Sequence, residues 1–334
     1  TGKFNMTDEL TQAFQEIEVE GAVETGEPVP SLQDLKVEEK INIIRVKSGY
    51  ESIDELVDFR GGNTYLIAGY EKSGKSSFAL GIVFHLLKEN YKLAFFNTEL
   101  TDQEFLTALT SLSHDISKDE AEQKPDLQEI FIKLFENKLT YAGINHLSKL
   151  GKLDFEKTIE IANKSAESGA KVFFFDNLTT YASQVTSGKK GWEVLADCVS
   201  RVIAFTKERS VISFIVIHTR PETVFSETPT GIRKLVESNE IESVFEKSLT
   251  VVRRPSGNDI YGGGGIRSQV SGTVLIWRPF QMFDKSPHLQ RLTQIILENF
   301  RHARGGSARF EFDGAKGQFK EDQLQGVMDN LKRV

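Results

Sequence analysis

The chain has 334 residues, 39% of them hydrophobic, and a formal net charge of −7. That length and apolar content suffice for one large core or two modest ones. The acidic balance gives no global basic signature, so any nucleic-acid contact must be local, on a loop or in a pore. The single cysteine, Cys198, excludes a disulfide scaffold and a cysteine-based zinc module, and fits a reducing compartment. No run approaches the roughly eighteen apolar residues of a membrane span, so we expect a cytoplasmic protein with no membrane partner.

The first 45 residues are acidic, poor in aliphatic side chains and interrupted by prolines, and we interpret them as a leader or linker. A capped helix is predicted to begin near Thr7, with Leu10, Phe14 and Ile17 on one face. This helix either docks on a neighbouring subunit or frays as a tail, and the pattern does not decide between the two. Residues 46–334 are expected to form one domain.

From about residue 41 onward, continuous apolar strands alternate with amphipathic helices. This alternation predicts an α/β fold with a mostly parallel central sheet covered by helices on both faces. A hairpin-like region follows the last parallel strand and predicts an antiparallel C-terminal extension. The predicted strands are 63–68, 92–97, 172–175, 211–217 and 273–277, and the predicted helices are 77–87, 103–113, 155–168 and 194–208. Pro125 is expected to interrupt the helical, charged stretch around it.

The segment Gly69–Ser76 reads Gly-Tyr-Glu-Lys-Ser-Gly-Lys-Ser, a complete G-x-x-x-x-G-K-[ST] phosphate-binding loop. A buried strand precedes it and an apolar helix follows it, which is the context that this motif requires. Lys75 is expected to reach the terminal phosphates of a nucleoside triphosphate, and the Ser76 hydroxyl to bind Mg²⁺. The nucleotide-contacting residues predicted here are Gly69, Ser73, Gly74, Lys75, Ser76 and Ser77. The alternative is a chance Gly/Ser/Lys-rich turn.

Three polar residues follow other predicted strands, at the edge where ligands bind in parallel α/β sheets. Asp176 is a candidate Mg²⁺ ligand, or alternatively a helix cap. Glu99 is a candidate base that orients and deprotonates the attacking water, although acids at strand ends are common. His218 can hydrogen-bond the γ-phosphate, and an isolated histidine there would more often be structural.

Taken together, these segments resemble the RecA-like motor domain of hexameric replicative helicases, the family of bacterial DnaB, phage helicases and mitochondrial Twinkle. The resemblance spans roughly residues 45–320. Its marks are the lead-in 48–56, the phosphate loop, Thr98-Glu99-Leu100, the strand ending at Asp176, Ile217-His218, residues 265–271 and residues 296–301. It implies a P-loop NTPase core, ATP and Mg²⁺ as cofactors, single-stranded DNA as partner, and assembly with copies of itself into a ring, with a hexamer as the expected form. Primase or other replisome proteins are further implied partners, and the setting is a bacterial host cell with a phage- or plasmid-encoded source.

The resemblance also implies roles for residues near the C-terminus. Arg301 corresponds to an arginine finger that reaches the next subunit's nucleotide, with Arg304 as the rival if the register slips. The family usually has a lysine two residues earlier, where this chain has Asn299, so the resemblance does not extend to a second cationic contact to the γ-phosphate. Gln269 falls in the motif beside the DNA-facing loop, and we count it among the nucleotide contacts.

Residues 220–267 form a long, loop-like and locally basic stretch, which favours a function over mere connection. The candidate nucleic-acid contacts are Arg233, Lys234, Arg253, Arg254, Gly263, Gly264 and Arg267. Interspersed glutamates dilute this charge, so a solvated surface insertion is the alternative interpretation.

Three functions are therefore open. The first is an ATP-driven ring translocase and helicase on single-stranded DNA. The second is a RecA-fold ATPase similar to RadA or KaiC, which binds nucleic acid or a protein without unwinding. The third is an inactive ring partner, against which the intact phosphate loop and both acids argue.

Overall fold

A computed structural model of the chain describes residues 43–183, 190–219, 225–226, 251–252, 254–260, 264–281 and 287–321. The leader helix predicted near Thr7 lies outside these residues, and the division between leader and main domain stays a prediction.

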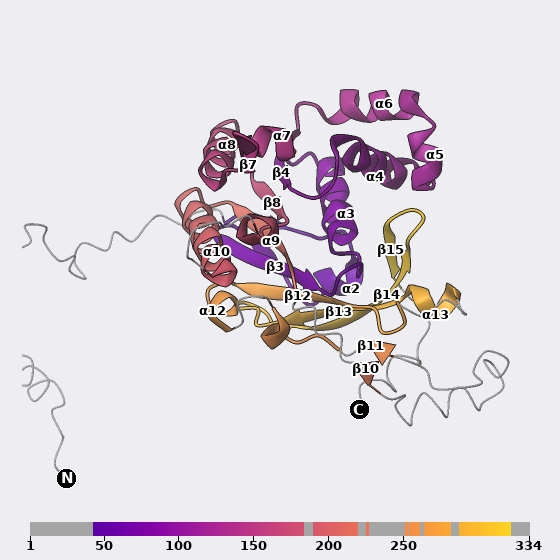
Figure 1. Cartoon of the computed structure of the whole chain (residues 1–334). Helices are drawn as coiled ribbons and strands as arrows, with labels where there is room; N and C mark the ends of the chain where they lie inside the picture. The colour runs from indigo at the N-terminus through magenta and orange to yellow at the C-terminus, as the bar shows by residue number, and fades with distance from the viewer. Residues whose placement is uncertain are drawn as a thin grey trace, which may run out of the picture. The chain divides into compact units, whose positions relative to one another are not determined.

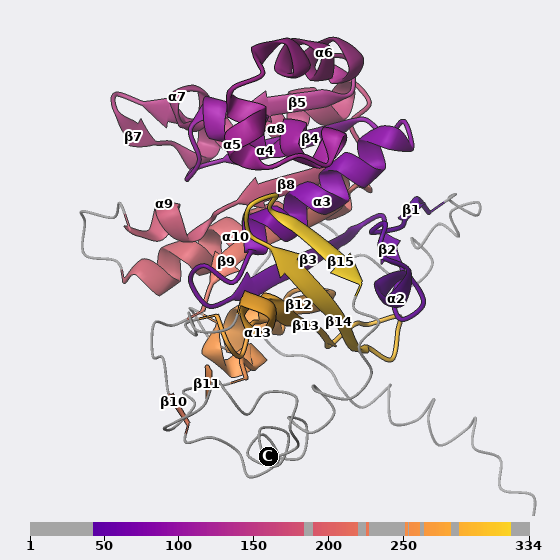
Figure 2. The same cartoon turned by 90° about the vertical axis from the view of Figure 1, so that its right-hand side faces the viewer.

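The largest sheet among the described residues has nine strands, in the order β15-β14-β13-β12-β3-β9-β8-β4-β5 (Figures 1 and 2). The six strands from β12 to β5 run parallel, whereas β13, β14 and β15 are added antiparallel. Their bounds are β3 (Asn63–Gly69), β4 (Leu93–Asn97), β5 (Leu139–Ala142), β8 (Val172–Asp176), β9 (Ile212–His218), β12 (Gly272–Trp277), β13 (Leu292–Glu298), β14 (Gly306–Asp313) and β15 (Gln318–Glu321). The expected parallel sheet with an antiparallel C-terminal extension is confirmed.

Shorter elements complete the described structure. The two-stranded pairs are β1 (Arg45–Val46) with β2 (Phe59–Arg60), β6 (Ser148–Lys149) with β7 (Lys152–Leu153), and β10 (Phe225–Ser226) with β11 (Val251–Val252). The helices are α2 (Glu51–Asp54), α3 (Lys75–Lys88), α4 (Asp102–His114), α5 (Lys118–Glu122), α6 (Pro125–Phe135), α7 (Ile144–Leu147), α8 (Phe155–Glu167), α9 (Thr179–Ser183), α10 (Gly191–Glu208), α12 (Gly264–Arg267) and α13 (Pro287–Arg291), with a 3₁₀ turn at Gly257–Asp259. No helix within these residues is long and apolar enough to cross a membrane.

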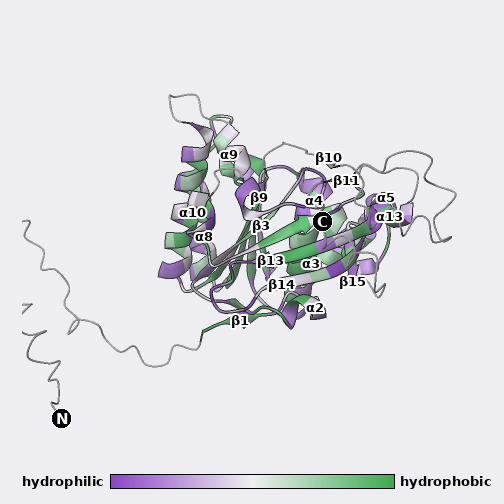
Figure 3. Cartoon of the chain, turned by 90° about the horizontal axis from the view of Figure 1, so that it is seen from below, coloured by the Kyte–Doolittle hydropathy of each residue, from purple (hydrophilic) through white to green (hydrophobic). Residues whose placement is uncertain are grey.

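Helices cover both faces of the sheet, with α3 and α4 on one side and α8 and α10 on the other (Figure 1). Successive residues of a strand pack against the helices on opposite faces of the sheet. Phe174 packs on the α3 side, whereas Phe173 contacts Phe205 of α10, with 4.9 Å between the ring centroids. Hydrophobic colour concentrates in the strands, and the helices α8 and α10 carry hydrophilic colour among their apolar residues (Figure 3). Strands buried on both faces in this way explain why their sequences are continuous apolar runs.

Aromatic pairs hold the central strands in register. Phe95, Phe174 and Phe214 lie opposite one another on β4, β8 and β9, and their rings stack at 5.8 and 4.9 Å. Because cross-strand aromatic pairs stabilise a sheet by about 0.2–1 kcal/mol each, they favour one alignment of the strand ends. That alignment brings Asn97 opposite Asp176, and Gly69 opposite His218.

Side-chain caps mark the start of two of the longer helices. Thr101 and Glu104 form a capping box that starts α4, and the Asp154 carboxylate caps α8. Pro125 does more than interrupt a helix, since it occupies the first position of α6, where its missing N–H costs nothing. The edge strand β5 and the short helix α9 were not predicted.

Candidate nucleotide site

The phosphate-binding segment joins β3 to α3 at the centre of the sheet. Gly74 precedes α3 with φ of +93°, a conformation that glycine adopts without strain, and no side chain caps the first turn of the helix. At Gly69, a Cβ atom would come within 2.6 Å of the Ser73 Oγ atom. Ser73 Oγ is itself buried without a hydrogen-bond partner among the described residues. Free amides, a helix dipole and an unpaired hydroxyl at one point form an anion site, with Ser76 and Ser77 in the same helical turn.

Lys75 is buried at the start of α3, and its Nζ atom donates to the Tyr70 carbonyl at 2.9 Å. Burial lowers the pKa of Lys75 to about 8, while Asp176, Glu99 and Glu71 act in the opposite direction. A lysine without a directly paired carboxylate, in a site that disfavours its charge, is suited to an added anion.

Asp176 ends β8 and is 1% exposed, yet neither of its carboxylate oxygens has a hydrogen-bond partner among the described residues. Burial raises the pKa of Asp176 to about 7, and Glu99 adds to the rise. The nearby Ser76 hydroxyl opposes it, although its geometry falls short of an ordinary hydrogen bond. Buried carboxylate oxygens of this kind are satisfied either by a proton or by a cation. Asp176 and Ser76 therefore fit a hydrated Mg²⁺ ion, which prefers one or two carboxylates beside phosphate oxygens.

Glu99 follows β4, and one of its oxygens accepts two hydrogen bonds. His218 Nε2 lies 2.9 Å from Glu99 Oε1, and Asn177 Nδ2 donates to the same oxygen at 2.7 Å. The hydrogen bond from His218 is the main reason that the pKa of Glu99 is lowered. The other oxygen, Oε2, has no partner among the described residues, and the side chain is 37% exposed. An ionised carboxylate with one oxygen anchored and the other open to solvent can orient a water molecule.

The backbone of Glu99 is fixed by Asn97, a residue that the sequence did not single out. Its Oδ1 atom accepts from the amides of Glu99 and Leu100 at 3.1 and 2.9 Å. Its Nδ2 atom donates to the Leu100 carbonyl and, at 3.0 Å, to the Tyr141 hydroxyl, which donates to Asp102 Oδ1 at 2.8 Å. The turn before α4 is thereby tied to β5. An Asn two residues before a strand-end acid was a signal for such a turn.

On the other side, Thr98 and Asn177 connect β4 to β8. The Thr98 hydroxyl donates to the Asn177 carbonyl and accepts from the Asn177 amide, both at 2.9 Å. Helix α9 continues this contact, because Thr180 Oγ1 lies 3.1 Å from Thr98 Oγ1 and Thr179 Oγ1 accepts from the His218 amide at 3.2 Å. Lys75, Glu99, Asp176 and His218 thus lie together at the carboxyl edge of the parallel strands.

Arg301 and Gln269 do not join this cluster. Strand β13 runs antiparallel to β12, so the end of β13 lies at the opposite edge of the sheet, with Glu298 opposite Thr273. Arg301 is exposed there, and its Nη2 atom donates to the Gln269 carbonyl at 3.3 Å. Arg304 is exposed at the same turn. The predicted roles of Arg301 and Gln269 stay predictions. Because both residues lie at the opposite edge of the sheet, neither can contact a nucleotide bound by the phosphate-binding loop of the same chain.

The candidate nucleic-acid residues are only partly covered by the structure. Arg233, Lys234, Arg253 and Gly263 lie outside the described residues. Arg254 is exposed and Gly264 begins α12. Arg267 is half-buried and forms an ion pair with Glu298 at 3.3 Å, so its charge is already partly compensated. Their role stays a prediction.

No protein-family model and no curated protein sequence matches this chain. Solved structures are similar to it. A solved ATPase domain shares 14% identity with this chain, over 96% of this chain and 100% of its own length, with a TM-score of 0.62. A DnaB-like replicative helicase, from a study of its interactions with primase, shares 13% sequence identity over 95% of this chain and 67% of its own, with a TM-score of 0.63. A KaiC-like protein from Pyrococcus horikoshii OT3 shares 13% sequence identity over 84% of this chain and 99% of its own, with a TM-score of 0.55. The chain therefore has the RecA-like fold of these ATPases.

Proposed function

We propose that this chain is an ATP-driven translocase that moves along single-stranded DNA and unwinds duplex DNA as a ring, with a hexamer as the expected form. The observation that carries the proposal is the separation of two sets of residues. Lys75, Asp176, Glu99 and His218 gather at one edge of the sheet, whereas Arg301 lies at the other. A site that needs Arg301 must then be completed by a neighbouring copy.

Each residue has a distinct task in this proposal. The amides of the first turn of α3 and Lys75 bind the β- and γ-phosphates, and the open Glu99 oxygen orients the attacking water. Ser76 and Asp176 would hold Mg²⁺, which neutralises phosphate charge when bound. Because Glu99 Oε1 is bonded to His218, loss of the γ-phosphate beside His218 is transmitted to the segment that follows β9. That segment, residues 220–267, is proposed to grip the DNA.

A mixing experiment tests assembly of the site between subunits. Arg301→Ala should bind ATP normally but lose on the order of 10³-fold or more in turnover, because a guanidinium that stabilises phosphoryl transfer is missing. Lys75→Ala should fail to bind the phosphates. In an equal mixture, about a quarter of interfaces would combine an intact loop with an intact Arg301, so activity should partly return. Arg304→Ala, at the same turn, is the control and should remain active.

Arg301→Ala hydrolysing ATP at the unmodified rate would rule out the finger assignment. Fork unwinding and hydrolysis, each measured with and without single-stranded DNA, then test the helicase part. The helicase part is supported if the unmodified chain unwinds the fork and Glu99→Gln does not.

A second candidate is an ATPase that binds nucleic acid or a protein partner without unwinding. The likeness to a KaiC-like protein over 84% of the chain favours it. Stimulation of hydrolysis by DNA without unwinding would support this candidate. Binding to a primase, and a role in replication of a phage or other mobile element, belong to the helicase proposal only.

A further inference from the structure

The β6–β7 hairpin, which precedes α8, has an unusual tip. Its two turn residues, Leu150 and Gly151, both have left-handed backbone conformations, with φ of +53° and +76°. Asn-Gly is the usual pair in such a turn, because a bulky side chain is strained there. Leu150 is also 98% exposed. A strained residue that leaves an apolar side chain wholly in water is not explained by folding, and points to a contact.

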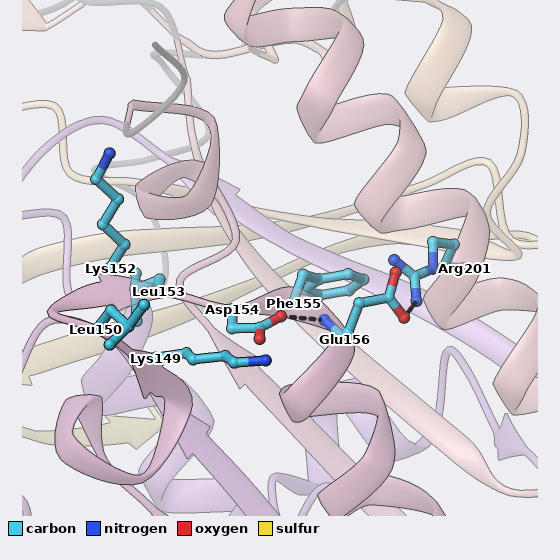
Figure 4. Close-up of a pocket in the computed structure, with 8 residues that line it drawn as sticks. All are labelled: Lys149, Leu150, Lys152, Leu153, Asp154, Phe155, Glu156 and Arg201. Carbon is cyan, nitrogen blue, oxygen red and sulfur yellow. Dashed lines mark hydrogen bonds and ion pairs between the residues drawn. The ribbon is translucent and has the colours of Figure 1, made fainter. Parts of the chain in front are cut away.

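The charges beside the tip are positive and unpaired. Lys149 and Lys152 flank the turn, are exposed, and form no ion pair within the described part of the chain. Both line an open cavity of about 480 Å³ between the hairpin, α8 and α10, where Lys152 points away from Asp154 and Glu156, and Lys149 extends toward their side (Figure 4). Of the two acids of this cavity, Glu156 pairs with Arg201 at 2.5 Å, whereas Asp154 caps α8 through the amides of Glu156 and Lys157 and keeps its charge. In a chain of net charge −7, this hairpin is a local cationic projection.

The hairpin is firmly anchored at its base. The Asp154 amide donates to the carbonyl of the buried Leu147 at 2.8 Å, and Lys157 Nζ donates to the Ser148 carbonyl at 3.1 Å. The tip is therefore presented by the start of α8 and can transmit a load to it.

The base of the hairpin is connected to the candidate nucleotide site through packed residues. Phe155, in the first turn of α8, meets the Tyr181 ring of α9 edge to face at 5.1 Å, and Thr158 bonds to the Tyr181 hydroxyl at 2.6 Å. In the same short helix, Thr179 and Thr180 contact the His218 amide and the Thr98 hydroxyl. A ligand at the tip thus lies at one end of a continuous set of contacts whose other end holds Glu99.

We propose that the β6–β7 hairpin is a contact for single-stranded nucleic acid, with Leu150 against a base face and Lys149 and Lys152 on the flanking phosphates. A strand offers this alternation of anionic groups and flat apolar faces, and leucine is among the side chains that proteins insert against bases. A single exposed leucine is too small for a stable protein interface, which needs roughly 1,000 Å². The proposal rests on the proposed function and adds a site that residues 220–267 do not include.

Two variants of the full chain separate the two kinds of contact. Binding of a fluorescent oligo-dT would be measured by anisotropy over a salt series. Lys149→Gln with Lys152→Gln should flatten the slope of log K against log salt by about 1.4, since each single-strand phosphate contact contributes about 0.7. Leu150→Asn should weaken binding about fivefold at unchanged slope, the low end of base-contact effects. Its melting temperature should hold or rise, because Asn suits the turn.

The matched control is Lys171→Gln with Lys207→Gln, two exposed lysines at the opposite edge of the sheet. It makes the same charge change and should leave both slope and affinity unaltered. Stimulation of ATP hydrolysis by oligo-dT should fall in the hairpin variants, while hydrolysis without DNA stays at the unmodified level.

The outcomes distinguish this proposal from the proposed function. If the unmodified chain binds oligo-dT and the hairpin variants behave like the control, the hairpin assignment is wrong and the function stands. If the unmodified chain hydrolyses ATP but binds no strand, both nucleic-acid assignments fall. If Leu150→Asn instead changes the oligomer mass in sedimentation, the tip contacts a second copy and the nucleic-acid assignment is overturned.

Discussion

Replacing Asp176 by asparagine should stabilise the nucleotide-free protein. Burial raises the pKa of Asp176 to about 7, against an ordinary 3.8. An acid whose folded pKa is raised costs no stability below pH 3.8; the cost grows as pH rises to 7 and is then constant. This difference between the two pKa values corresponds to on the order of 4 kcal/mol above pH 7. Asparagine removes this cost, but its own unpaired amide costs about 1–3 kcal/mol, so a net gain of about 2 kcal/mol is expected at pH 8.

Urea unfolding without nucleotide, at pH 5 and pH 8, measures this effect. The gain in unfolding free energy of Asp176→Asn over the unmodified chain should be about 2–3 kcal/mol larger at pH 8 than at pH 5, because only part of the cost of ionising the buried acid is present at pH 5. Asp197→Asn, at an exposed site on α10, is the control and should show no such pH dependence. Adding Mg·ATP should raise the melting temperature of the unmodified chain more than that of Asp176→Asn. An advantage equal at both pH values, or a less stable variant at pH 8, would refute the reasoning.

Two further substitutions test how the site is supported. Tyr141→Phe removes the hydroxyl that ties the turn before α4 to β5, and we expect kcat for ATP to fall about tenfold with KM little changed; unchanged steady-state kinetics would contradict this. Gly74→Ala meets both a φ of +93° and a Phe319 ring carbon at 2.8 Å, and should lower the unfolding free energy by about 2–3 kcal/mol. Gly151→Ala is the control, because Gly151 has a φ of +76° but open space around it, so this variant introduces backbone strain alone. If thermal melts show the same loss of stability in both variants, the contact with the Phe319 ring is unimportant.

Patterns within one element were sufficient to predict the centre of the fold. The runs ending at Gly69, Asn97, Asp176 and His218 are buried on both faces, so each predicts a parallel strand by itself. Parallel strands bring their ends to one edge, which is why Lys75, the two acids and the histidine could be placed together before any contact was known.

Contacts between elements were not predictable in this way. The bond between Glu99 and His218 joins residues 119 positions apart, and the link from Asn97 to Tyr141 spans 44. Each depends on strand order, with β8 between β4 and β9 and β5 at the edge. The β6–β7 hairpin was missed for another reason, because Lys-Leu-Gly-Lys carries no alternating strand pattern and its Leu occupies a position that usually belongs to Asn.

The sheet itself explains why one subunit would hold an incomplete site. If β13 ran parallel to β12, its end would lie at the level of Gly69, with β12 between them, and Arg301 would be at the same edge as its own chain's nucleotide site. Its antiparallel direction instead carries Arg301 to the level of Thr64, through bonds from the Arg301 amide to Ser271 and from the Ser271 amide to Thr64. Five residue-to-residue steps along β3 separate that level from Gly69, roughly 16 Å at about 3.3 Å per step. The polarity of one added strand thus keeps Arg301 away from the candidate nucleotide site of its own chain, and under the proposed function its guanidinium would act on a neighbour.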